Sequence, residues 1–133
     1  MSGEEGRKTR ILLADGHHMV RQGIRRLLES EADFEVVGES DNGSEVVRLA
    51  RELKPHVIVM EARMPKLDSV DVIKRIKAEH PEATILVLTS RDEEECLELL
   101  RAGAGGYLLK SAKGEELAQS IRWCGPDSLS VTH

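Results

Sequence analysis

The chain has 133 residues, of which 32% are charged and 40% hydrophobic, and its formal net charge is −5. This length is enough for one domain with a full core, and no apolar run approaches the ~20 residues that a membrane helix needs. The lysines and arginines are scattered and only 2% of the residues are aromatic, which argues against direct nucleic-acid binding by these residues.

The beginning of the sequence is polar and mixed in charge and lacks the apolar core of a signal peptide, so we expect a cytoplasmic protein with no membrane partner. The two cysteines, Cys96 and Cys124, fall in helical patterns without metal-ligand spacing. We interpret them as free, buried thiols in a reducing compartment. We expect a flexible N-terminus over residues 1–8, a single domain over 9–125, and a tail or the start of a linker over 126–133.

Five short apolar runs predict five β-strands. The second run has polar alternate positions, which suggests a strand at the edge of a sheet. The third run is rich in β-branched residues, has no internal polar break and is followed by Glu61, which suits a strand buried on both faces. The five predicted strands lie at residues 10–14, 34–40, 55–60, 83–89 and 107–109.

Helical periodicity follows each of these runs, so strands and helices alternate five times. This alternation predicts an α/β fold in which parallel strands are joined by right-handed helical crossovers. In the first and third helices, the apolar residues predicted to face the core are Val20, Ile24, Leu27, Leu28, Val70, Ile73 and Ile76.

Polar side chains stand at the ends of four predicted strands: Asp15, Glu61, Thr89 and Lys110. Ligands collect at the carboxyl edge of an open parallel sheet, and Asp15 and Glu61 lie side by side if the first and third strands are neighbours. Such a cluster could bind a divalent cation through oxygen atoms. With an Asp in the central place it could also accept a phosphoryl group, held by the lysine and the hydroxyl.

With these strand ends in place, the sequence resembles the receiver domain of bacterial two-component response regulators over nearly its whole length. The segment at 17–23 and the Tyr-Leu-Leu-Lys ending look closest to the NarL/FixJ (LuxR-type) subfamily, whose members usually carry a C-terminal helix-turn-helix domain. The resemblance implies a flavodoxin-like three-layer fold with strand order 2-1-3-4-5 and five helices. The motifs that carry it are Ile-Leu-Leu-Ala-Asp at 11–15, Met-Pro at 64–65, Leu-Asp at 67–68, Leu-Thr-Ser at 88–90 and Gly-Tyr-Leu-Leu-Lys at 106–110.

The resemblance also implies roles for individual residues. Glu61 stands at the phosphoacceptor position, Thr89 at the hydroxyl position and Lys110 at the lysine position of the family. Tyr107 matches the aromatic position that, with Thr89, takes part in the family's switch between two packings. Asp15 matches the first of two consecutive acids that help to hold a magnesium ion.

The chain departs from the family pattern at three positions. Gly16 replaces the second acid, Glu61 replaces the usual Asp, and Ser69 stands where the family usually has Gly. The extra methylene of Glu moves the attacking oxygen by ~1.5 Å, and a misplacement on the order of 1 Å can cost ~100-fold in rate. Loss of one oxygen ligand weakens an octahedral magnesium site, so residual metal binding by Asp15 and Glu61 is expected to be weak at best.

We therefore predict a pseudo-receiver, which is a receiver domain that is not phosphorylated in the ordinary way. It would not be an enzyme and would need no cofactor, with Mg²⁺ bound only if the site still functions. The side chain of Glu61 admits three interpretations that the sequence leaves open. It could reach toward Thr89 and Lys110 and mimic the phosphorylated state, or pair with Lys110 in a silent site. Residual phosphotransfer is the third, including adventitious transfer to Asp15 or Asp68.

Two histidines and one tryptophan complete the candidate residues. His17 and His18 follow the first strand, but a metal role would need more ligands at fitted spacing, so we interpret them as loop or helix-cap residues. Trp123 lies off the apolar face of the last helix. It marks either a dimer or domain contact or a surface that the C-terminal tail covers.

The sequence thus predicts a signal-transduction module of a response regulator, and the resemblance implies that this regulator is a transcriptional one. The expected partners are a sensor histidine kinase or another signalling protein and a second copy in a homodimer, with DNA contacted only through an output domain absent from these residues. The first alternative is a conventional Mg²⁺-dependent phospho-accepting receiver. The second is a small-ligand-binding protein of flavodoxin type.

Overall fold

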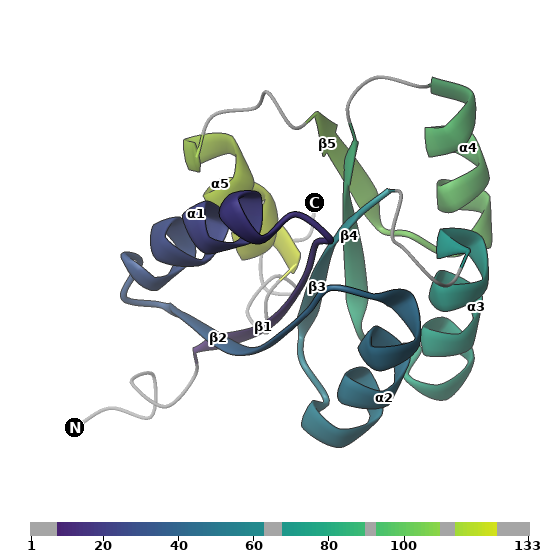
Figure 1. Cartoon of the computed structure of the whole chain (residues 1–133), viewed down its shortest axis with the longest axis horizontal. Coiled ribbons are helices and arrows are strands. Elements are labelled where there is room, and N and C mark those ends of the chain that lie inside the picture. Colours follow the sequence, from purple (N-terminus) through teal and green to yellow (C-terminus); the bar gives the residue numbers. More distant parts are fainter. Residues whose placement is uncertain (1–7, 63–67, 90–92, 110–113, 125–133) are drawn as a thin grey trace.

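The computed structural model describes residues 8–62, 68–89, 93–109 and 114–124, without the side chains of 93–95 and 124. Five parallel strands form one sheet in the order β2-β1-β3-β4-β5, as predicted (Figure 1). The strands are β1 (Thr9–Ala14), β2 (Phe34–Ser40), β3 (Val57–Glu61), β4 (Thr84–Thr89) and β5 (Gly106–Leu109). The helices are α1 (His18–Glu29), α2 (Gly43–Leu53), α3 (Ser69–Glu79), α4 (Glu93–Ala102) and α5 (Gly114–Cys124).

Helices cover both faces of the sheet, which makes a three-layer sandwich. Helices α1 and α5 lie on one face and α2, α3 and α4 on the other (Figure 1). Strand β1 supplies both cores, because successive side chains of a strand point to opposite faces. Ile11 and Leu13 pack in the core beneath α1 and α5, whereas Leu12 and Ala14 pack in the other. All five residues of β3 are buried, so the prediction of a strand covered on both faces is confirmed.

Local sequence signals fix several helix boundaries. Asn42 begins α2 and Asp68 begins α3, and each side chain accepts a backbone N–H of the first turn, which satisfies one of the amides left without a helical partner. Lys54 adopts a left-handed conformation (φ 49°) and ends α2 just before Pro55. Gly103 ends α4 with φ 126°, a region that glycine enters without the steric cost of a Cβ.

One of the predicted core positions is corrected by the structure. Val20 is 42% exposed, and the prediction that it faces the core is wrong. It lies eight residues before the buried Leu28, a separation that rotates it by about 80° around the helix axis. In α3, Val72 is buried with Ile73 and Ile76, and Val70 is partly buried and packs against the same core, as predicted. The buried stripe of α3 is therefore wider than the predicted one.

Two further features that the composition predicted concern membrane-spanning helices and the cysteines. Among the described residues, no helix is long and apolar enough to cross a membrane. Cys96 is a free, buried thiol, as predicted. The side chain of Cys124, the N-terminal residues 1–7 and the tail from 125 onward lie outside the described part of the chain.

Candidate functional site

The two acids predicted to meet do lie side by side. Strand β1 pairs with β3 in parallel, with Ala14 opposite Met60, so the next residues, Asp15 and Glu61, share the carboxyl edge of the sheet. Asp15 is completely buried and Glu61 is 5% exposed. Two carboxylates with so little access to water require close polar or charged partners, because burial penalises the ionised form.

The loop that follows β1 supplies several of these partners. The backbone N–H of Gly16 donates to Oε1 of Glu61 at 3.2 Å, and the backbone N–H of His17 donates to Oδ1 of Asp15 at 2.7 Å. The position at which the family has a second acid therefore contributes a backbone donor here. Both acids are oriented by the same two-residue segment.

The ring of His17 contacts both acids. Its Nδ1 lies 3.4 Å from Oδ1 of Asp15 and 3.3 Å from Oε2 of Glu61, and its side chain is 66% exposed. His17 occupies the N-cap position of α1, as predicted, but its side chain makes no capping hydrogen bond. Sequence reasoning missed this contact, although the position two residues after Asp15 allows the ring to fold back over the strand ends.

Arg21 of α1 stabilises the same loop through hydrogen bonds from its guanidinium. Its guanidinium donates to the backbone carbonyl of Asp15 at 2.6 Å and to Glu39 of β2 at 2.8 Å. Burial acts to raise the pKa of Glu39, but hydrogen bonds from Arg25 and Arg21 outweigh it and hold that pKa below its ordinary value. A carboxylate fixed by two guanidinium groups anchors α1 to β2 at the edge of the candidate site.

The other predicted site residues are only partly described. Thr89 ends β4, pairs with Leu109 of β5 and is buried, whereas Tyr107 of β5 is 45% exposed. Lys110 follows β5 directly but lies outside the described residues, as do the motif at 64–65 and the serine at 90. The structure thus brings Asp15 and Glu61 together and leaves a pairing of Glu61 with Lys110, one of the three interpretations, untested.

Ser69, the third departure from the family pattern, forms a buried hydrogen bond. Its hydroxyl donates to the backbone carbonyl of Ala62 at 2.5 Å. This bond joins the end of β3 to the first turn of α3, immediately beyond Glu61. A glycine at this position would have no side chain with which to make the bond, and sequence reasoning did not predict it.

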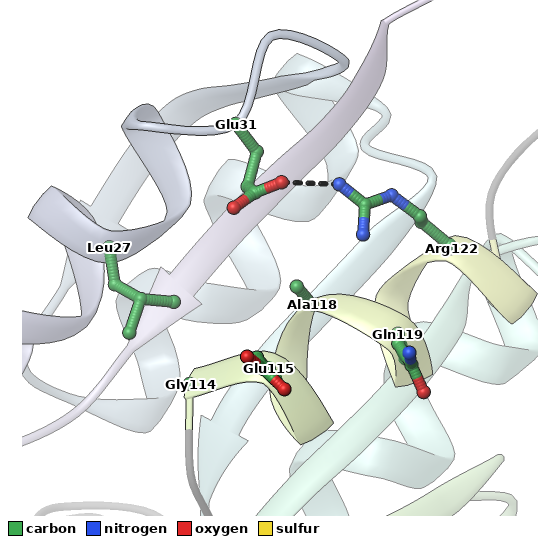
Figure 2. Close-up of a pocket in the computed structure, with 7 residues that line it drawn as sticks. All are labelled: Leu27, Glu31, Gly114, Glu115, Ala118, Gln119 and Arg122. Atoms are coloured by element: carbon green, nitrogen blue, oxygen red, sulfur yellow. Dashed lines mark hydrogen bonds and ion pairs between the residues drawn. The ribbon is translucent and has the colours of Figure 1, made fainter.

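A hollow lies between α1 and α5 (Figure 2). It contains none of the predicted site residues. Arg122 crosses one end of it and forms an ion pair with Glu31. The residues that line it are Leu27, Glu31, Gly114, Glu115, Ala118, Gln119 and Arg122.

Comparison with known proteins decides the family. The family model of the response regulator receiver domain matches residues 11–122. The chain belongs to this family. The receiver domain is 46% identical over 114 residues to the transcriptional regulatory protein LiaR of Bacillus subtilis (strain 168), a match that covers 85% of the chain and 54% of LiaR. It spans about half the length of the curated relatives it matches.

Solved structures agree with this assignment. The signal receiver domain of the response regulator NarL from Mycobacterium tuberculosis superposes with a TM-score of 0.85 at 28% identity, covering 89% of this chain and 96% of that one. A two-component response regulator of the LuxR family from Aurantimonas sp. SI85-9A1 gives a TM-score of 0.82 at 33% identity, covering 92% and 94%. The predicted relation to NarL- and LuxR-type receivers is thereby confirmed.

Functional receiver domains bind Mg²⁺, and the donor atoms of this receiver domain fit that ion poorly. Asp15, His17 and Glu61 each offer one ligand atom, and the three atoms lie within 4.8 Å of one another. Mg²⁺ takes oxygen ligands in near-ideal octahedral geometry, several of them water molecules. Here one of the three donors is an imidazole nitrogen, and Gly16 supplies no side-chain oxygen. This donor set is therefore a poor match for the magnesium chemistry of the family.

Proposed function

We propose that this receiver domain is a pseudo-receiver, whose acceptor position is silent in Mg²⁺-dependent phosphotransfer. The observation that carries the proposal is the environment of Glu61. Its carboxylate is buried, one oxygen accepts the Gly16 N–H, and the other lies beside the His17 ring. A nucleophilic carboxylate needs an oxygen aimed at the incoming phosphorus, and these contacts orient the Glu61 carboxylate toward the loop after β1.

Two of the three departures from the family pattern, Gly16 and Glu61, act on the same step. The longer side chain of Glu61 moves its oxygens away from the place that an Asp oxygen occupies, and loss of the second acid removes a ligand from the ion that neutralises the phosphoryl group. An in-line displacement depends on both positions at once. We expect the native chain to lose at least ~100-fold in phosphorylation rate from the misplacement alone.

The same contacts bear on the alternatives for Glu61. Both of its oxygens contact the loop after β1, through Gly16 and His17, which supports a silent site. A mimic that reaches toward Thr89 and Lys110 stays an alternative. Pairing between Glu61 and Lys110 stays a prediction. Adventitious phosphorylation of Asp68 also stays an alternative; its Oδ1 accepts a backbone N–H at the start of α3.

The test is the intact mass of the protein after incubation with acetyl phosphate and Mg²⁺. We expect the native chain to stay unmodified and the Gly16→Asp/Glu61→Asp double variant to gain one phosphoryl group. The matched control is Gly16→Asp/Glu61→Asn, which restores the second acid but offers no nucleophile at position 61. Stoichiometric phosphorylation of the native chain would overturn the proposal.

We also propose that the domain works as part of a longer transcription regulator. The curated relatives are about twice as long as the part that matches, so an output domain would follow and would make the DNA contacts. A sensor histidine kinase or another signalling protein would be the upstream partner. Exposure of Trp123 on α5, at 56%, supports a homodimer or domain contact through this helix. Sedimentation of Trp123→Ser beside the native chain tests whether the helix takes part in self-association.

A further inference from the structure

The three side chains that fit Mg²⁺ poorly have the composition of a different metal site. We infer that Asp15, His17 and Glu61 bind a first-row transition-metal dication of the Zn²⁺ type in preference to Mg²⁺. This inference deepens the proposed function and rests on it, because a site that had kept its magnesium chemistry would have no need of a nitrogen ligand.

The distances between donor atoms support tetrahedral coordination. Zn²⁺ takes nitrogen and oxygen ligands at about 2.0–2.2 Å in a tetrahedron, which places neighbouring donors roughly 3.3–3.6 Å apart. The Nδ1 atom of His17 lies 3.4 Å from Oδ1 of Asp15 and 3.3 Å from Oε2 of Glu61. In a magnesium octahedron with ligands at 2.0–2.1 Å, adjacent donors would be only about 2.9 Å apart. Two edges of the triad therefore match a zinc tetrahedron.

The chemistry of the donors points the same way. Imidazole nitrogen suits zinc, copper, iron and nickel, whereas oxygen-only sets suit magnesium, calcium and manganese. Gly16 stands where the family has an acid, so the site lacks a side-chain oxygen that would favour magnesium. Asp15 and Glu61 also bring two carboxylates together in a buried place, where each offers an oxygen of the kind that a zinc-type dication binds.

The ligands are already oriented by the fold. The backbone N–H groups of Gly16 and His17 hold the two carboxylates in place, which is the role that outer-shell hydrogen bonds play at metal sites. An oxygen that accepts one hydrogen bond keeps a second lone pair for a metal. The exposed ring of His17 leaves the site open to solvent, so an ion could enter and a water molecule could complete the tetrahedron.

The experiment is a calorimetric titration of the untagged full chain with Zn²⁺ and, separately, with Mg²⁺. We expect one equivalent of Zn²⁺ to bind at least 100-fold more tightly than Mg²⁺. His17→Gln should weaken zinc binding at least tenfold. The matched control is His18→Gln, which changes the neighbouring exposed histidine outside the triad and should leave zinc binding unchanged.

Cobalt supplies a readout of geometry. Co²⁺ titrated into the native chain should give the intense visible absorption of a tetrahedral nitrogen and oxygen site, and His17→Gln should abolish it. Equal zinc affinity in the native chain and His17→Gln, or zinc binding no tighter than Mg²⁺ binding, would overturn the inference.

These titrations contain no phosphodonor, so they separate the two proposals. A native chain that binds zinc through His17 yet accepts a phosphoryl group with Mg²⁺ would overturn only the pseudo-receiver proposal. A native chain that does neither would overturn only the metal inference.

Discussion

His56 closes the amino-terminal side of β3, at the far end of the strand from Glu61. The backbone N–H of Arg10 donates to Nδ1 of His56 at 2.9 Å, and the backbone N–H of His56 donates to the Arg10 carbonyl at 2.9 Å. The first of these bonds requires an unprotonated Nδ1. Burial and the nearby charge of Arg10 lower the pKa of His56 below 6.5.

Stability should therefore decrease as the pH falls through the region of this pKa. The unfolded chain binds the proton at the ordinary pKa of about 6.5, whereas the folded chain binds it only at lower pH, so protonation favours unfolding. The stabilisation that neutral His56 gives to the fold is fully present above pH 6.5 and is lost as the pH falls below that value. Urea unfolding at pH 7.5 and pH 5.5 should show a loss on the order of 1 kcal/mol, the net value of one hydrogen bond.

The control for this prediction is His56→Asn, which removes the titrating group. Its urea midpoint should change less between the two pH values than that of the native chain. An equal pH dependence in both proteins would assign the effect to other groups.

Single residues also mark the limit of sequence reasoning at the candidate site. Asp15 and Glu61 could be placed together from the strand pattern, because parallel strands end at a common edge. The ring orientation of His17 and the bond from Ser69 to Ala62 depend on side-chain torsions and on loop paths that periodicity does not encode. The predicted contact of Lys110 lies outside the described residues.

At the scale of elements, Gly23 and Gly103 show how the effect of an added Cβ differs between the interior and the end of a helix. Gly23 lies inside α1, where an added Cβ would have no neighbour within 4 Å, whereas a Cβ on Gly103 would approach Cγ of Lys77 to 2.9 Å. Gly103 also has a positive φ of 126°, which an L side chain rarely adopts.

Replacement of each glycine by alanine should therefore have opposite effects. Gly23→Ala should raise the free energy of unfolding by about 0.5–1 kcal/mol through helix propensity and reduced freedom of the unfolded chain. Gly103→Ala should lower it by roughly 1–3 kcal/mol through backbone strain. Chemical denaturation of the two variants beside the native chain measures both, and a stabilising Gly103→Ala would show that α4 can end in another conformation.

The type and order of the elements were the most predictable part of the molecule. Continuous apolar runs identified the buried strands, and the polar alternates of residues 34–40 correctly indicated the edge strand β2. Helix faces were less predictable. Val20 and Val72 show why, since the width of a buried stripe depends on how the helix lies on the sheet and not on spacing alone.

At the scale of the whole molecule, Arg122 joins the last helix, α5, to the turn between α1 and β2. Its guanidinium donates to both oxygens of Asp33, at 2.9 and 3.1 Å, and to Glu31, and it lies 5.0 Å from the centre of the Phe34 ring. The carboxylates raise the pKa of Arg122, so it stays charged at every pH of interest. Figure 2 shows its ion pair with Glu31 beside the hollow between α1 and α5.

Arg122→Gln should lower the free energy of unfolding by about 1 kcal/mol, because partly exposed ion pairs and cation–π contacts each contribute modestly. The loss should shrink in 1 M salt, where exposed charges are screened. Arg122→Lys keeps the charge but not the planar fork, and its midpoint should lie between those of the other two proteins. Unfolding curves at low and high salt test this order, and a loss independent of salt would point to packing instead of charge.

The contact made by Arg122 has a consequence for the synthesis of the protein. It joins positions 89 and 91 residues apart in the chain, so Asp33 and Glu31 leave the ribosome long before their partner is made. During translation, Glu31 and Asp33 therefore lack their ion-pair partner Arg122. The core beneath α1 and α5 can be completed only after α5 has emerged. Since domains tend to fold as units during synthesis, this receiver domain should reach its closed form late, only once α5 has left the ribosome.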